Sequence, residues 1–460
     1  MAGIGFELKK IYGRKTLAAN LWGTFYAIMT TIGPTVISAM LMLVLNYLLA
    51  REDLTVLEGR FFIASVTYAF LIALLVAVLF SSPVSRYIAD CIYLEKEEDI
   101  FPSAFGVLTI SSALSGLIML ALCVGMYLDP YEVPMTFIVA YYFLGVLMTA
   151  TYSMMTYASA LKHYVALTVS FFLGFLLAIV VYLICNNWLA IDKVTAACLA
   201  LASCYFLVTF ALVFQCVRAF GAPRGRYFAF LEYFRRYPKL AIGGAAYMLG
   251  LYCPTIIYWF LSDMAEKVCI FRTIPPYDSA MFLAFVVNVP SLVIFVVKVE
   301  TAFYEKFSLY VSALNNGPLD LIQKERSVMA RALLQQLFFV YEVQLITTVI
   351  LICLVNVFFP YLNASIHMLN VFILLSLGIC SVFCMYFTIV VFQYFSDYNG
   401  AYISSLVFLI ITIIGSLTAA LGSEFYLLSL PLLLGGLCGW ILCFLLVRRR
   451  MKKLDSFLMC

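Results

Sequence analysis

Three carboxylates lie in or beside apolar stretches of this sequence, where charge is costly. Glu342 lies inside one such stretch, and Asp278 and Glu300 bracket another at residues 279–299. An ionisable side chain at membrane depth usually faces a polar cavity and marks the route of an ion or a substrate. We therefore interpret these three residues as candidates for a transport path.

Two of these carboxylates also have simpler explanations. Asp278 would cap the N-terminus of a helix over residues 279–299, where acidic residues are favoured. Glu300 would pair with Lys298 or Lys306 at the level of the lipid headgroups. Both explanations stay open at this point.

Prolines interrupt several of the apolar stretches. Pro34 and Pro254 each lie in the middle of one, and Pro290 follows Asn288 in another. A proline removes a backbone donor and kinks a helix. In lipid, the freed carbonyl is tolerated only against protein or a wet cavity. We expect these four residues to line a central cleft, with simple packing kinks as the alternative.

Aromatic residues are abundant, with 40 Phe, 31 Tyr and 4 Trp. Tyrosines at the ends of spans usually form interfacial belts, and that explains most of them. Tyr252 and Tyr258 lie deeper in their stretch. Aromatic faces with hydroxyl tips suit weak, repeated contact with sugar rings, so both residues join the candidate path.

The motifs of most enzyme classes are missing. The sequence contains no P-loop, no Asp-x-Asp, no Gly-x-Ser-x-Gly and no His-Glu-x-x-His. Its two histidines, His163 and His367, are far apart, and its 14 cysteines are scattered through apolar runs. Such cysteines usually behave as small buried hydrophobes. We expect no enzyme activity, no cofactor, no metal site and no nucleic-acid partner.

The composition is that of a membrane protein. Hydrophobic residues make up 65% and charged residues 11% of the chain, and the mean hydropathy is +1.05. Soluble domains are about half apolar and about a quarter charged. A chain this apolar could not cover a water-facing surface, so the elements that carry the candidate residues must cross a membrane.

Twelve apolar stretches are each long enough for a spanning helix of roughly 20 residues. The sequence therefore predicts an all-α polytopic protein of about 12 transmembrane helices. The predicted spans are residues 21–49, 61–82, 102–127, 134–159, 164–185, 195–217, 239–261, 279–299, 334–359, 367–393, 400–420 and 425–447.

The spans divide into two halves of six. The predicted domain organisation is an amphipathic N-terminal segment at 1–20, a first half at 21–217, a linker at 218–238, a second half at 239–447 with an amphipathic loop at 300–333, and a basic tail at 448–460. With this division, 23 of the 28 Lys and Arg residues fall on the side of the termini. The positive-inside rule then places both termini in the cytoplasm.

The two halves repeat each other. An offset of 220 residues aligns Pro34-Thr35 with Pro254-Thr255 and, without a gap, the second span with the eighth. An offset of six helices leaves both halves in the same orientation. Parallel repeats of this kind build many transporters, with the substrate path between the halves.

Several stretches resemble the Pel exopolysaccharide transporter family, PelG. The resemblance lies in MAGIGFELKK at 1–10, Gly33-Pro34, YDSAMFLA at 277–284 with Pro290, and FVVKVETAFYEK at 295–306. The stretch YFSD at 394–397 is similar to the family's Tyr-Phe-Asp-Arg, but its order is altered and the arginine is absent. The resemblance extends over the whole chain and its twelve-span plan.

This resemblance implies a bacterial inner-membrane protein of the multidrug/oligosaccharidyl-lipid/polysaccharide (MOP) superfamily, with two six-helix halves around a central cleft as in its multidrug and toxin extrusion (MATE) members. It implies export of the Pel polysaccharide, a partly deacetylated aminosugar polymer, for biofilm matrix. It also implies a complex with PelD-like and PelE-like membrane proteins and a cytoplasmic glycosyltransferase. The alternatives are an ion-coupled multidrug exporter and a lipid-linked oligosaccharide flippase of the same fold.

Four arginines of the linker form a candidate docking surface. Arg224, Arg226, Arg235 and Arg236 lie between the halves, where anionic headgroups already attract basic residues by about 1 kcal/mol each. Membrane lipid is therefore one expected partner, and a companion protein is the other.

Overall fold

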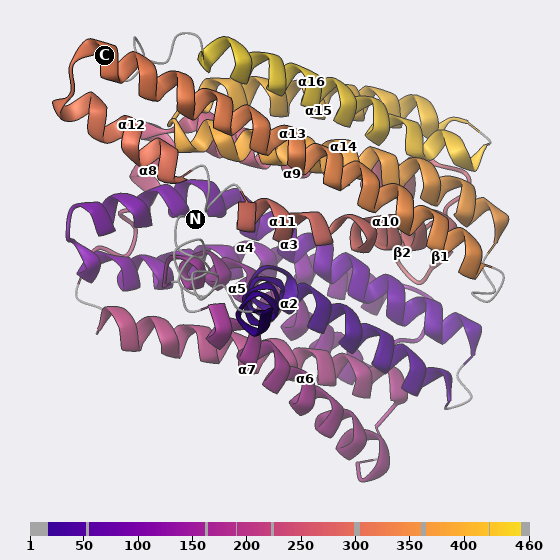
Figure 1. Cartoon of the computed structure of the whole chain (residues 1–460). Helices are drawn as coiled ribbons and strands as arrows, with labels where there is room; N and C mark the ends of the chain where they lie inside the picture. The colour runs from indigo at the N-terminus through magenta and orange to yellow at the C-terminus, as the bar shows by residue number, and fades with distance from the viewer. Residues whose placement is uncertain are drawn as a thin grey trace. The chain divides into compact units, whose positions relative to one another are not determined.

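The computed structural model describes residues 17–51, 55–161, 164–189, 191–221, 225–298, 304–359, 365–422 and 424–451. Within them, twelve helices are long and apolar enough to cross a membrane, which confirms the predicted number of spans (Figure 1). The first six are α2 (Leu17–Ala50), α3 (Val56–Tyr93), α4 (Ile100–Leu128), α5 (Met135–Leu161), α6 (Tyr164–Asn187) and α7 (Lys193–Phe220).

The second six spans begin after a short helix, α8 (Leu231–Arg236). They are α9 (Pro238–Leu261), the consecutive pair α10 (Pro275–Asn288) and α11 (Pro290–Lys298), α13 (Leu319–Phe358), α14 (Ile366–Tyr394), α15 (Tyr398–Ala420) and α16 (Leu430–Met451). Between them lie the strands β1 (Glu266–Val268) and β2 (Phe271–Thr273), the helix α12 (Tyr304–Asn316) and the 3-10 turn η4 (Phe425–Ser429); a further turn, η1 (Glu97–Asp99), precedes α4.

Polar side chains fix where several spans begin. At the start of α3, the Thr55 hydroxyl accepts the N–H of Glu58, and the Glu58 carboxylate accepts the N–H of Thr55, which completes a capping box. Asp192 caps α7 and Ser365 caps α14, each by accepting the backbone N–H three residues further on. These caps satisfy backbone donors that would otherwise be unpaired at the helix ends.

Two of the spanning helices have different bounds from the apolar stretches that predicted them. The predicted helix at 279–299 begins four residues earlier, at Pro275, and is interrupted between Asn288 and Pro290. Proline is well suited to the first turn of a helix but not to its interior, and both effects occur here. The predicted span at 334–359 belongs to a 40-residue helix that already starts at Leu319.

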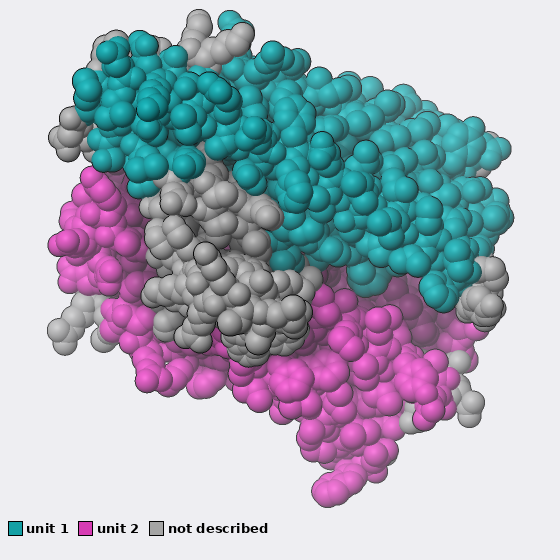
Figure 2. Space-filling view, in the orientation of Figure 1, with its two compact units in different colours: residues 1–32, 249–264, 274–460 teal, residues 33–248, 265–273 magenta. Residues whose placement is uncertain are grey.

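The chain forms two compact units (Figure 2). Unit 2 comprises Gly33–Met248 and Ala265–Thr273, and unit 1 comprises the residues up to Ile32, Leu249–Met264 and Ile274–Cys460. The boundary falls inside α9. The short segment that holds β1 and β2 belongs to unit 2, although unit 1 precedes and follows it in the chain.

That segment is an antiparallel hairpin in which Glu266 pairs with Thr273 and Val268 with Phe271. Its fully buried Phe271 ring packs 4.9 Å from Tyr68 and 5.9 Å from Phe61, measured between ring centroids. The Tyr68 hydroxyl donates to the carbonyl of Arg272 at 2.9 Å and accepts its N–H at 3.2 Å. The hairpin is therefore anchored on α3 by both packing and hydrogen bonds.

Two ion pairs flank the hairpin. Arg60 pairs with Glu266 at 2.5 Å and Lys267 pairs with Asp129 at 3.3 Å. The N–H of Tyr131 and the ammonium of Lys267 lower the pKa of Asp129 below its usual value. Three of the four side chains are about half exposed or more. Each pair therefore contributes little to the free energy of unfolding, about 0–1 kcal/mol.

Candidate functional site

A kink in the eighth span brings an amide side chain into the interior of unit 1. Pro290 has no N–H, so it cannot bond to the carbonyl one turn earlier. The helix resumes at once as α11, and the Ser291 hydroxyl donates to the Asn288 carbonyl at 2.7 Å. Asn288 is only 1% exposed at this junction, so its side chain must find its partners within the protein.

Those partners come from α13 and α14. The Asn288 amide nitrogen donates to the carbonyl of Ala284 at 2.8 Å and to that of Ser376 at 3.2 Å. Its oxygen accepts the Thr348 hydroxyl at 2.8 Å and the amide N–H of Gln344. We call Asn288, Gln344, Thr348 and Ser376 the amide cluster, which Ser376 joins through its backbone carbonyl; three of its members are fully buried.

Two oxygens of the amide cluster have no hydrogen-bond partner among the described residues. These are Oε1 of Gln344 and Oγ of Ser376. Buried polar atoms are nearly always paired, and an exception calls for a water or an ion. The Cys380 thiol lies against Gln344 and Thr348. The cluster is thus a polar but uncharged site with acceptor capacity left over.

A second polar contact joins α13 and α14, about one turn before Gln344 on α13 and about three turns after Ser376 on α14. The Tyr341 and Thr388 hydroxyls are 2.5 Å apart, and the Tyr341 ring packs edge-on to Trp440 at 5.1 Å. Neither Gln344 nor Thr348 was identified from the sequence. Their spacing of four residues places them on one helix face, which was the signal available.

Asp278 lies in the first turn of α10 and is engaged as a cap. Its carboxylate accepts the indole N–H of Trp259 at 3.1 Å and the N–H of Ile274 at 3.0 Å. These bonds agree with the interpretation of Asp278 as a residue that caps the start of this helix. They join the end of α9 to the start of α10 within unit 1.

Three other candidates lie along α9. Pro254 is buried. The Tyr252 ring stacks on Phe285 of α10 at 5.9 Å and 12°. The Tyr258 hydroxyl donates to the carbonyl of Leu428 at 2.8 Å, and its ring meets Tyr277 edge-on. In this structure both tyrosines therefore contribute to the packing of unit 1.

Glu342 lies on the opposite face of α13 from the amide cluster. It is exposed, as are its neighbours on that face, Phe339, Leu345 and Ile346. Gln344, two residues further on, is fully buried. The carboxylate predicted from the sequence and the amides found in the structure therefore mark two different surfaces of one helix.

The remaining candidates are divided between unit 2 and undescribed positions. Pro34 is a buried residue of α2 in unit 2. Glu300 and Arg224 lie outside the residues that the structure describes.

Three of the four linker arginines are exposed on and around α8, namely Arg226, Arg235 and Arg236. The helix that presents two of them is held to unit 2 by Tyr233, whose hydroxyl donates to Asp90 at 3.0 Å. Partial burial and this carboxylate raise the pKa of Tyr233 to about 12. Asp90 also pairs with Arg86 at 3.2 Å.

The aspartate of the YFSD stretch at 394–397 pairs with an arginine from a distant part of the chain. Asp397 is 2% exposed and caps α15 by accepting the N–H of Asn399. It also pairs with Arg450 of α16 at 2.5 Å. Asp397 of this stretch therefore has a basic partner on the last helix.

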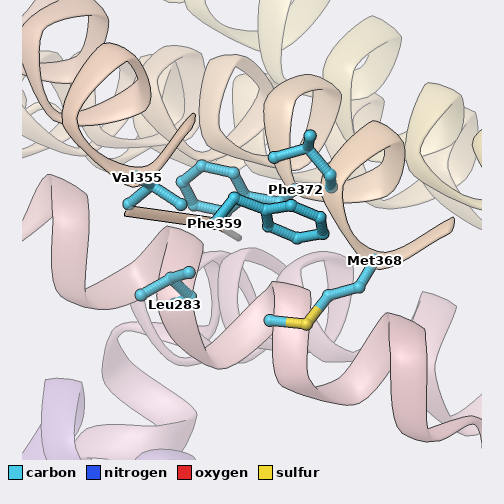
Figure 3. A pocket seen from close by; sticks show the side chains of 6 residues that line it. Leu283, Val355, Phe359, Met368 and Phe372 are labelled. Atoms are coloured by element: carbon cyan, nitrogen blue, oxygen red, sulfur yellow. The ribbon is translucent and has the colours of Figure 1, made fainter. Parts of the chain in front are cut away.

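An apolar pocket in unit 1 is unsuited to sugar. Figure 3 shows side chains of α10, α13 and α14 gathered around it. The residues that line it are Leu283, Val355, Phe359, Met368, Leu369 and Phe372. None of them offers a hydrogen bond to a hydroxyl group. Within the described part of unit 1, the amide cluster is the better candidate for polar chemistry.

Solved structures share this fold. The chain is similar to a MATE family transporter of the MOP superfamily in an outward-facing conformation, with a TM-score of 0.64 and 13% identity over 94% of this chain and 96% of that one. It is similar to a MOP superfamily transporter from Pyrococcus furiosus with a TM-score of 0.63 and 13% identity over the same shares. No curated protein sequence matches the chain.

A family model matches residues 1–458, under the description "PelG: Putative exopolysaccharide Exporter (EPS-E)". The match spans nearly the whole chain and agrees with the twelve-span transporter fold. It also confirms the resemblance seen in the sequence motifs. The chain belongs to the PelG family of exopolysaccharide exporters and is a multi-pass membrane protein with the MOP transporter fold.

Proposed function

We propose that this exporter works in the bacterial cytoplasmic membrane, with both termini in the cytoplasm, and carries a Pel-type polymer outward without enzymatic activity of its own. The observation that carries the proposal is the family match over residues 1–458. A Pel-type polymer is partly deacetylated, so its free amino groups make it a cation. The path should therefore offer carboxylates and neutral oxygens rather than basic side chains.

The distribution of charge supports this orientation. Basic segments stay on the cytoplasmic side of a membrane, and 23 of the 28 Lys and Arg residues fall in segments on the side of the termini. A reporter fused after Cys460 should be active only in the cytoplasm, and one inserted between β1 and β2 only outside. The opposite result would reverse the orientation.

Glu342 and Glu300 are proposed to attract the polymer's amino groups. Glu342 supports this role because it is exposed on an apolar helix face, where an unpaired carboxylate is costly. In cells that make the polymer, Glu342→Gln with Glu300→Gln should lower secretion several-fold at unchanged abundance. Glu98→Gln, which changes an exposed acid of the turn η1 before α4, is the control. Normal secretion by the double variant would exclude the role.

The linker arginines are proposed to dock PelD-like and PelE-like membrane proteins and a cytoplasmic glycosyltransferase. The exposure of Arg226, Arg235 and Arg236 supports this, while attraction to anionic lipid is the competing explanation. Reversing the charge of these three and Arg224 should abolish co-purification of the companions without reducing insertion. If secretion and co-purification both survive, these arginines serve the lipid surface instead.

A further inference from the structure

We propose that the β1–β2 hairpin is a strap that couples the two units during export. It stays docked on unit 2 while it holds the end of α9 and the start of α10 in unit 1, which we call the α9–α10 corner. The chain passes from unit 1 into unit 2 between Met264 and Ala265 and returns between Thr273 and Ile274. It also crosses the boundary inside α2 and α9, but a continuous helix can bend.

The docked end of the strap is an aromatic cluster of unit 2. Phe271 is 0% exposed, and its ring lies 4.9–5.9 Å, between centroids, from those of Phe61, Tyr68 and Tyr141. Burial of such rings stabilises a contact far more than one exposed ion pair does. The hairpin should therefore stay docked when a single hydrogen bond or ion pair is removed.

The other ends of the strap are fixed within unit 1. On the side of α9, the N–H of Met264 donates to the Ser262 hydroxyl at 3.3 Å. On the side of α10, the N–H of Ile274 donates to the Asp278 carboxylate at 3.0 Å. The same carboxylate accepts the indole N–H of Trp259 in α9. Asp278 thus joins the two sides of the α9–α10 corner to each other.

The connectors between these anchors have almost no free length. Glu266 and Thr273 are already paired within the hairpin. Ala265 alone therefore separates the hairpin from Met264, and no residue separates it from Ile274. One residue spans about 3.5 Å at most. Rocking of one half against the other is common in transporters built from repeats, and this strap would limit it to movements that leave the α9–α10 corner attached to unit 2.

The first test lengthens the strap without changing its contacts. A Gly-Ser-Gly-Ser-Gly-Ser segment is inserted after Met264 and again after Thr273, which gives each connector about 13 Å of additional reach. Folded proteins usually tolerate loop insertions of this size. We expect secretion per inserted molecule to fall at least about fivefold, while the unfolding temperature of the purified full-length protein changes little.

The matched control carries the same segment after Gly422, in the loop between α15 and η4 of unit 1, and should secrete normally. If the double insertion does not fold, one lengthened connector, after Met264 or after Thr273, replaces it and should also lower secretion. Normal secretion by a lengthened strap at normal abundance would overturn the proposal.

Cross-linking distinguishes a strap from a latch that opens in every cycle. Arg60 of α3 pairs with Glu266 of β1 at an exposed position, so Arg60→Cys and Glu266→Cys can be joined by a short, reducible thiol cross-linker. Secretion should be the same before and after cross-linking, with the treated wild-type chain as the control. A loss of secretion that reduction reverses would show that the hairpin must leave α3, which would contradict the proposal.

A distance measurement tests the coupling without the polymer, so it separates a failure of the strap from a failure of the proposed substrate. Cys353 and Cys438, which are exposed, are changed to alanine, and spin labels are attached at Asp263→Cys in unit 1 and Glu132→Cys in unit 2, both exposed positions. The intact strap should give a narrow distribution of distances and the lengthened strap a broader one. Equal distributions would show that the hairpin does not couple the units.

Discussion

Tyr68 in unit 2 and Asn288 in unit 1 are aligned by the 220-residue offset predicted from the sequence, but their polar atoms are bonded in different ways. The Tyr68 hydroxyl is satisfied twice, by the N–H and the carbonyl of Arg272 in the hairpin. Asn288 joins two other polar side chains whose own oxygens include one that is unpaired. Tyr68 is therefore a structural anchor, whereas Asn288, itself fully bonded, contacts an amide whose own oxygen is unpaired among the described residues.

The helices around these two residues differ in the same way. Phe70 is the counterpart of Pro290, and α3 runs without interruption from Val56 to Tyr93, whereas α10 stops at Asn288. In both units, most buried hydroxyls bond to carbonyls of their own helix, such as Thr149 to Gly145 in unit 2 and Thr388 to Cys384 in unit 1. The difference between the two positions is therefore local: a bridged hydroxyl on an unbroken helix at Tyr68, and an amide at a helix break at Asn288.

Phe271→Ala should give the largest loss of stability, because it removes the buried ring that anchors the hairpin to α3. Truncating a buried Phe costs about 3–5 kcal/mol. The unfolding temperature of the purified protein is the measurement, and Phe206→Ala, which truncates an exposed ring of the same unit, is the control. An equal effect of both substitutions would show that the hairpin is not anchored there.

Pro290→Ala should make the eighth span resemble the second. Restoring the N–H lets α10 and α11 join into one helix, so stability should stay the same or rise while secretion falls several-fold. Secretion per inserted molecule and the unfolding temperature are measured together. Pro83→Ala in α3 is the matched change in unit 2 and should leave secretion largely intact. Full secretion by Pro290→Ala would show that export does not need the kink in the eighth span.

Tyr68→Phe should have a smaller effect than the loss of stability from Phe271→Ala or the loss of secretion from Pro290→Ala. It deletes the hydroxyl that bridges Arg272, at a cost of about 1–2 kcal/mol for the lost hydrogen bonds. We expect a slightly lower unfolding temperature and normal secretion. A large loss of secretion at normal stability would mean that the Tyr68 hydroxyl takes part in export directly, and not only in anchoring the hairpin.

Arg60→Met should have the smallest effect. The pair with Glu266 is about half exposed on both sides, so it contributes at most about 1 kcal/mol. The unfolding temperature should fall slightly at low salt and hardly at all at high salt, because salt screens exposed charges. A loss comparable to that of Phe271→Ala would show that charge, not packing, holds the hairpin.

The sequence predicted the spans well because their signal is strong. Twenty or so apolar residues in a row have few stable alternatives to a spanning helix, and all twelve were found. The extra turns of α13 before residue 334 were missed, since they contain charged residues and lie beyond the apolar run. The hairpin was missed because strands of three residues leave almost no pattern.

The candidate site was predicted only in part. Pro290 was identified because a proline inside a span kinks the helix, and Asn288 because it lies two residues before that proline. Gln344, Thr348 and Ser376 were not, because isolated polar residues are common in spanning helices and only contact between helices distinguishes them. The charge of Glu342 drew attention to the wrong face of α13 for this cluster, since periodicity alone does not say which face is buried.

The central claim, that the exporter depends on the amide cluster of unit 1 and not on its counterpart in unit 2, is tested most directly by comparing secretion in two variants. Asn288→Leu keeps the approximate size of the side chain and removes its polar atoms, and Tyr68→Phe does the same in unit 2. Secreted polymer is measured per molecule of inserted exporter. Asn288→Leu should secrete at least tenfold less, and Tyr68→Phe should secrete normally. Normal secretion by Asn288→Leu at normal abundance would contradict the account.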